Sequence, residues 1–97
     1  MTIEELERLV AKTIALYEKE TRHAATATRE MIQNLGVVET LSRLVISGTL
    51  QQGFKVLRDR KLLEQSFEQI VVQNPHFFKP EVITAARWRL DHAFELL

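Results

Sequence analysis

Apolar residues recur three and four positions apart along the chain, from Ile3 to Leu97. This spacing places them on one side of successive α-helices, whereas a half-buried strand would alternate apolar and polar positions. The chain of 97 residues has the length of one domain, residues 1–97. The pattern therefore predicts an all-α protein, a compact helical bundle of about five helices with a long N-terminal helix.

The N-terminal stripe is the longest, and it covers residues 3–35 in steps of three or four. Its middle is thin in apolar volume, because residues 24–28 are only Ala and Thr. Two alternatives follow, one long helix or two helices with a break near residues 21–25. Since no Gly or Pro lies there, we expect one helix, straight or with a bend, which Gly36 ends.

Four further helices are predicted after this one, each from its own apolar stripe. They cover residues 38–47, 49–58, 63–73 and 80–97, and Gly48, Pro75 and Pro80 lie at their boundaries. Gly53 lies inside a helix at a cost of about 1 kcal/mol relative to alanine, which a close contact with another helix would explain. The residues that we place in the core are Phe54, Leu57, Phe67, Ile70 and Leu90.

The composition is that of an ordinary globular protein, with 45% hydrophobic and 27% charged residues. The chain has no cysteine, which excludes disulfides, thiolate nucleophiles and cysteine-ligated metal sites. No stretch approaches the length of a membrane span. The acidic, amphipathic start differs from a signal peptide. We therefore expect a soluble cytoplasmic protein with no membrane contact.

Catalytic motifs are missing from the sequence. There is no Gly-rich phosphate loop, no nucleophile elbow and no paired-histidine zinc motif. His92 has Asp91 beside it and Glu95 three residues on, a group that can in principle ligate a metal or relay a proton. The alternative is a polar helix face, which is far more common for a lone surface histidine. We expect no enzyme activity, cofactor or metal.

Basic residues are concentrated in one segment, although the net charge of the chain is zero. Residues 43–61 hold five basic residues and one acidic residue. They overlap a helix, a Gly turn and a second helix over residues 38–61, which is the outline of a helix-turn-helix. The candidate nucleic-acid face is Gln51, Gln52, Lys55, Arg58, Arg60 and Lys61. The acidic flanks favour a solvated basic face instead, with little DNA binding at physiological salt.

Trp88 lies nearly opposite the apolar stripe of the last predicted helix. A large aromatic on a charged face is typical of an interface anchor, since Trp and Arg are enriched at binding hot spots. The alternative is a helix buried on two sides, with Trp88 packed against the first helix. The candidate partner interface is Trp88, Arg87, Arg89 and His92.

These patterns predict a non-enzymatic protein-interaction module that forms a homodimer. A second copy would cover the apolar surface that a small bundle leaves exposed, most often about a two-fold axis. The alternative function is a DNA-binding regulator that uses residues 38–61. Residues 43–90 are typical of small prokaryotic helical proteins but indicate no particular family.

Overall fold

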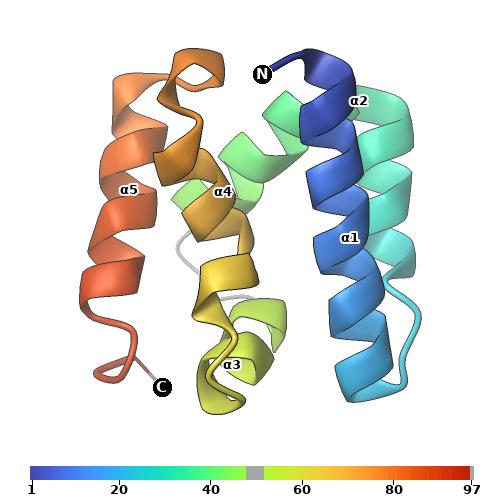
Figure 1. The fold of residues 1–97 in the computed structure, drawn as a ribbon, viewed down its shortest axis with the longest axis vertical. Coiled ribbons are helices and arrows are strands. Elements are labelled where there is room, and N and C mark those ends of the chain that lie inside the picture. Colours follow the sequence, from blue (N-terminus) through green and yellow to red (C-terminus); the bar gives the residue numbers. More distant parts are fainter. Residues whose placement is uncertain (48–51, 97) are drawn as a thin grey trace.

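The computed structural model describes residues 1–47 and 52–96, and over these residues it is helical with no strand (Figure 1). The all-α bundle of about five helices is therefore confirmed. In chain order the elements are α1 (Ile3–Thr21), α2 (Thr26–Ile46), α3 (Gln52–Asp59), η1 (Leu63–Gln65), α4 (Phe67–Gln73), η2 (Pro75–Phe77) and α5 (Pro80–Asp91), where η denotes a 3₁₀ helix.

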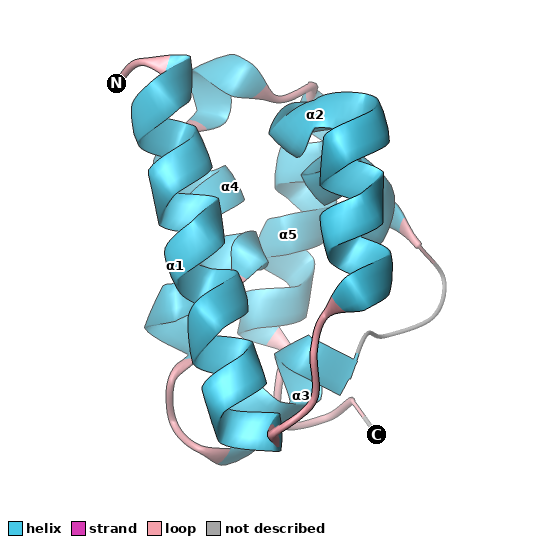
Figure 2. Cartoon of the chain, turned by 90° about the vertical axis from the view of Figure 1, so that its right-hand side faces the viewer, coloured by secondary structure: helices cyan, strands magenta, loops and turns pink. Residues whose placement is uncertain are grey.

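The helices form two layers. Figure 2 shows α1 and α2 side by side and running in opposite directions, with α4 and α5 behind them. The second half of α2 packs against α4 and α5, while α3 packs against α1 at one end of the bundle. Each layer thereby covers the apolar side of the other.

The N-terminal segment forms two helices, so the expected single helix over residues 3–35 is wrong. α1 ends at Thr21, and Arg22 caps it in the left-handed region at φ 60°. That conformation costs a non-glycine residue about 1–2 kcal/mol. The thin middle of the stripe is therefore a turn, and the apolar residues on its two sides belong to different helices.

Glu18 stabilises this turn. The backbone N–H of Ala25 donates to Glu18 Oε2 at 2.7 Å, and Arg29 Nε donates to the same oxygen at 3.0 Å. The hydrogen bonds from Arg29 and from the Ala25 backbone lower the pKa of Glu18 to about 2. One carboxylate thus joins the end of α1 to the start of α2, and the turn between them forms without Gly or Pro.

We expect Glu18→Gln to lower the urea midpoint at pH 7 more than Glu7→Gln, a matched change at an exposed position of α1. The pKa of Glu18 is lower in the folded protein than its ordinary value of 4.5. Its contribution to stability is therefore present above that value and is lost as the pH falls toward 2. The difference in urea midpoint between the wild type and Glu18→Gln should therefore be smaller at pH 3 than at pH 7. A gap independent of pH would show that this charge does not hold the turn.

The predicted stop at Gly36 is present as a kink inside α2. Gly36 has φ 83° and ψ 166°, a combination that is essentially restricted to glycine. The chain resumes helical geometry at once, so α2 continues to Ile46. The predicted boundary at Gly48 lies outside the described residues.

The core lies between the two layers. Phe54, Leu57 and Ile70 are buried as predicted, and Phe67 is partly buried against the core. Leu90 is only partly buried, so its assignment to the core is wrong. The fully buried residues of α1, α2, α4 and α5 that fill the core include Leu6, Val10, Leu41, Val45, Val71, Val82 and Ala86.

Two further details concern helix contacts. A Cβ atom on Gly53 would lie 3.3 Å from the ring of Tyr17, so the predicted close approach of α3 to another helix is confirmed, and the helix is α1. The sequence predicts a stripe of Ile83, Ala86, Leu90, Ala93 or Phe94, and Leu97 for the last helix. Ala86 and Ala93 are buried as predicted, but Val82 and Arg89 are buried in place of their neighbours Ile83 and Leu90. A charged residue therefore occupies a core position of the last helix.

Candidate functional site

An open groove lies between the end of α2 and one face of α5. Its volume is about 690 Å³. Ile46 on α2 and Trp88 on α5 are both large apolar residues that are 51% exposed. We call this hollow the Trp88 groove, and it is lined by Val45, Ile46, Ser47, Glu81, Thr84, Ala85, Trp88, Arg89 and Leu96.

The Trp88 side chain is held in place by His92. The two rings stack with their centroids 4.3 Å apart and their planes 18° from parallel. His92 Nδ1 lies 2.8 Å from the backbone oxygen of Trp88, which positions the imidazole one turn further along the chain. The indole is therefore exposed but ordered, and an ordered anchor loses less conformational entropy when it binds.

Arg87 and Arg89 have different environments. Arg87 is exposed, but Arg89 is buried, with its side chain only 8% exposed. Arg89 therefore does not lie on an exposed charged face, although it forms part of the groove wall, and its place in a partner interface stays a prediction. The cause is the rotated register of α5, which turns position 89 inward. Of the predicted interface, the structure brings Trp88 and His92 together.

Arg89 connects three helices. Its Nη1 lies 3.1 Å from Glu68 Oε2 on α4 and donates to the backbone oxygen of Leu44 at 3.1 Å. Its Nη2 donates to the backbone oxygen of Ser47 at 2.5 Å. Sequence spacing does not reveal this ion pair, because Glu68 and Arg89 are 21 residues apart.

Burial raises the pKa of the Glu68 carboxyl, since the ionised form loses water. The hydrogen bond from its own backbone N–H and the pairing with Arg89 oppose this effect only in part. The environment of Glu68 therefore disfavours the charged form of its carboxyl group, and the neighbouring guanidinium of Arg89 makes that charge tolerable.

The candidate nucleic-acid residues have separate environments. Arg58 is largely buried, with its side chain 12% exposed. It pairs with Asp59 at 2.9 Å and donates to the backbone oxygen of Ala93 at 3.1 Å. It also donates to the backbone oxygen of Leu96. Arg58 thus binds the C-terminal segment, a role that sequence reasoning missed and that no spacing signals.

The other members of this set are less constrained. Arg60 forms an ion pair with Glu20 on α1 at 2.9 Å. Gln52 and Lys61 are exposed and Lys55 is partly buried, while Gln51 lies outside the described residues. α3 packs on α1 and η1, and α2 packs on α4 and α5. The main packing partners of these two helices therefore differ from those in a helix-turn-helix, where the two helices pack on each other.

His92 has the stacked indole as its neighbour. Over residues 1–47 and 52–96, no three His, Asp or Glu side chains are grouped closely enough to hold a metal ion. In the same part of the chain, no helix combines the length and the apolar character needed to cross a bilayer. Comparison of the chain with protein-family models, with curated proteins and with solved structures finds no match.

Proposed function

We propose that this chain is a non-enzymatic protein-interaction module that forms a two-fold homodimer through the Trp88 groove. The observation that carries the proposal is the half-exposed, ordered indole of Trp88 beside the equally exposed Ile46. Large apolar side chains grouped at a hollow with polar neighbours are typical of interaction surfaces. Tryptophan is the residue most enriched among those that dominate binding free energy.

A second copy is the partner that fits this geometry. A two-fold interface uses the same patch on both subunits, so the patch must contain both a projection and a recess. Trp88 is 51% exposed and lines the recess together with Val45 and Leu96. The ring of each subunit can then enter the groove of the other.

The groove supports this proposal without the apolar stripe that was predicted over residues 3–35. The expected 3–35 stripe would have offered a second apolar surface along one long helix. The structure divides it, and the buried residues of α1, including Leu6 and Val10, face the core of the same subunit. The dimer contact therefore depends on α5 and the end of α2.

Sedimentation at micromolar concentration tests the dimer. We expect the wild-type chain to sediment as a dimer of the 11.3 kDa subunit. Trp88→Ala should weaken association by about thirtyfold or more, as removal of a hot spot worth about 2 kcal/mol requires. Phe94→Ala is the matched control, because Phe94 is 78% exposed and lies outside the groove lining.

Fluorescence gives a second measurement, because Trp88 is the only tryptophan. Iodide should quench the indole less as the protein concentration rises through the dimerisation range. A monomer at all concentrations, with Trp88 quenched throughout, would rule out self-association. Steeply salt-dependent binding to a defined DNA duplex would favour the alternative function, a DNA-binding regulator that uses residues 38–61.

A further inference from the structure

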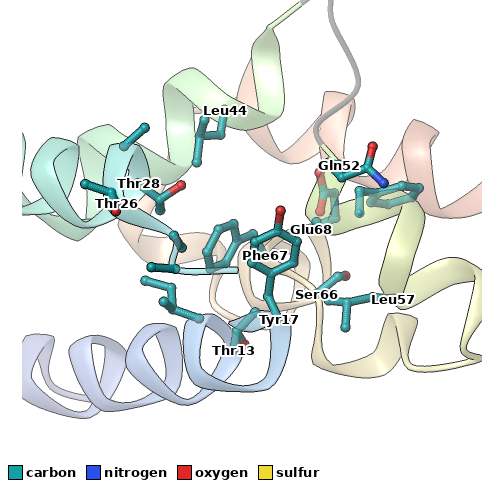
Figure 3. Close-up of a pocket in the computed structure, with 16 residues that line it drawn as sticks. Thr13, Tyr17, Thr26, Thr28, Leu44, Gln52, Leu57, Ser66, Phe67 and Glu68 are labelled. Atoms are coloured by element: carbon teal, nitrogen blue, oxygen red, sulfur yellow. The ribbon is translucent and has the colours of Figure 1, made fainter. Parts of the chain in front are cut away.

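A second hollow, separate from the Trp88 groove, lies among α1, the α1–α2 turn, α3 and α4 (Figure 3). Its volume is about 310 Å³, within the range of small-molecule sites. We propose that it binds a small, largely apolar molecule of one or two rings that carries a hydroxyl or amine. The two hollows have no lining residue in common, so this proposal does not depend on the dimer.

The cavity has a buried floor and an exposed mouth. Thr13, Ser66 and Glu68 line the floor and are almost fully buried. Ala24 and Gln52 also line the hollow and are exposed to solvent. A molecule can therefore enter past the α1–α2 turn and reach the buried carboxyl of Glu68.

Aromatic side chains shape the interior. Figure 3 shows the rings of Tyr17 and Phe67 within the hollow, with Leu44 across from them. Gly53 lies against the Tyr17 ring, where even a Cβ atom would be 3.3 Å away. An engineered apolar cavity of about 150 Å³ binds benzene, so a hollow of twice that size accommodates one or two rings. Flat aromatic walls favour a planar ligand.

The polar group at the floor determines the head group of the ligand. Ionised Glu68 accepts hydrogen bonds and donates none. Arg89 donates to Oε2 and the backbone N–H of Glu68 donates to its own carboxylate, while no other side chain of residues 1–47 and 52–96 is seen to donate to it. A hydroxyl or amine can therefore donate to Glu68, whereas a carboxylate would be repelled. The Tyr17 hydroxyl, for which the described residues likewise show no partner, is a second polar contact.

The test uses three probes that share one ring and differ in the head group: benzyl alcohol, benzylamine and benzoate. Each is titrated into the wild-type protein while backbone and methyl resonances are followed by NMR. We expect saturable shifts at cavity residues such as Thr13 and Ala25 with the alcohol and the amine. Benzoate should bind at least about tenfold more weakly, since a like charge beside Glu68 is unfavourable.

Two variants fill the cavity from different positions. Ala25→Leu and Thr28→Leu add side-chain volume at the lining and should each weaken probe binding at least about tenfold. Trp88→Ala changes only the other hollow and should leave probe binding unchanged. If a filling variant fails to fold, the proposal is still tested on the wild-type protein, by comparing the three probes and by locating the residues whose resonances shift. Absence of saturable shifts, equal binding of benzoate, or shifts confined to the Trp88 groove would overturn the proposal.

Discussion

Replacing Arg89 with alanine is expected to reduce the free energy of unfolding by about 3–5 kcal/mol at pH 7, the cost of leaving a buried charge without its partner. Glu68 would remain buried, and the backbone oxygens of Leu44 and Ser47 would each lose a donor. Domains of this size have only about 5–15 kcal/mol of stability in total. Urea denaturation followed by circular dichroism measures the loss.

The matched control is Arg87→Ala, which removes a guanidinium from an exposed position two residues earlier on α5. A surface substitution of this kind should change stability by no more than about 0.5 kcal/mol. If both variants lost the same stability, burial of the Glu68–Arg89 pair would not be the cause.

The loss in Arg89→Ala should depend on pH. Because burial raises the pKa of Glu68 above its ordinary value of 4.5, the folded state takes up a proton more readily than the unfolded state. Removal of Arg89 takes away one of the causes that lower this pKa, so the folded variant gains more stability from protonation of Glu68 than the wild type does. This gain is fully present below about 4.5 and is lost as the pH rises through the folded-state pKa. Arg89→Ala should therefore be least destabilised in mildly acidic solution. A loss that grows as the pH falls would contradict this account.

A double variant separates the charge from the packing. Glu68→Met with Arg89→Met removes both charges and keeps apolar volume, and such exchanges of buried ion pairs are often neutral or stabilising. We expect it to recover much of the stability that Arg89→Ala loses. Failure to recover would indicate that the hydrogen bonds of Arg89 to α2 matter more than its pairing with Glu68.

Truncation of Leu41 to alanine is expected to cost about 2–5 kcal/mol, the range for a fully buried leucine. Leu41 lies on the second half of α2 with 0% of its surface exposed. It belongs to the cluster that α1, α4 and α5 share, so the cavity left behind cannot be closed by solvent-facing side chains. Thermal or urea denaturation measures the loss.

Leu90→Ala is the matched change, because it removes the same atoms from a position that is only partly buried. The smaller area that it buries predicts a loss below about 1.5 kcal/mol. Equal losses at Leu41 and Leu90 would show that the register of α5 follows the predicted stripe and not the one in the structure.

The helices themselves are determined by the sequence. The signals that specify them act over four residues or fewer. They are the spacing of three and four residues, the capping pair of Thr2 and Glu5, and the prolines at 75 and 80. Signals of this range can be identified from the amino-acid sequence alone. The all-α class and the interruption at Gly36 were therefore accessible without a structure, whereas the sequence left open whether Trp88 is exposed or packed.

Only the tertiary structure decided the features that depend on distant residues. The turn after Thr21 is held by Glu18 with Arg29, which are 11 residues apart. The face that α5 buries is set by the pairing of Arg89 with Glu68, and Arg58 is drawn inward by the backbone of the C-terminal segment. Any rule based on neighbouring residues assigns a charged residue to the surface. Burial of the charge is tolerable only beside a partner, and here folding brings that partner from a distant part of the chain.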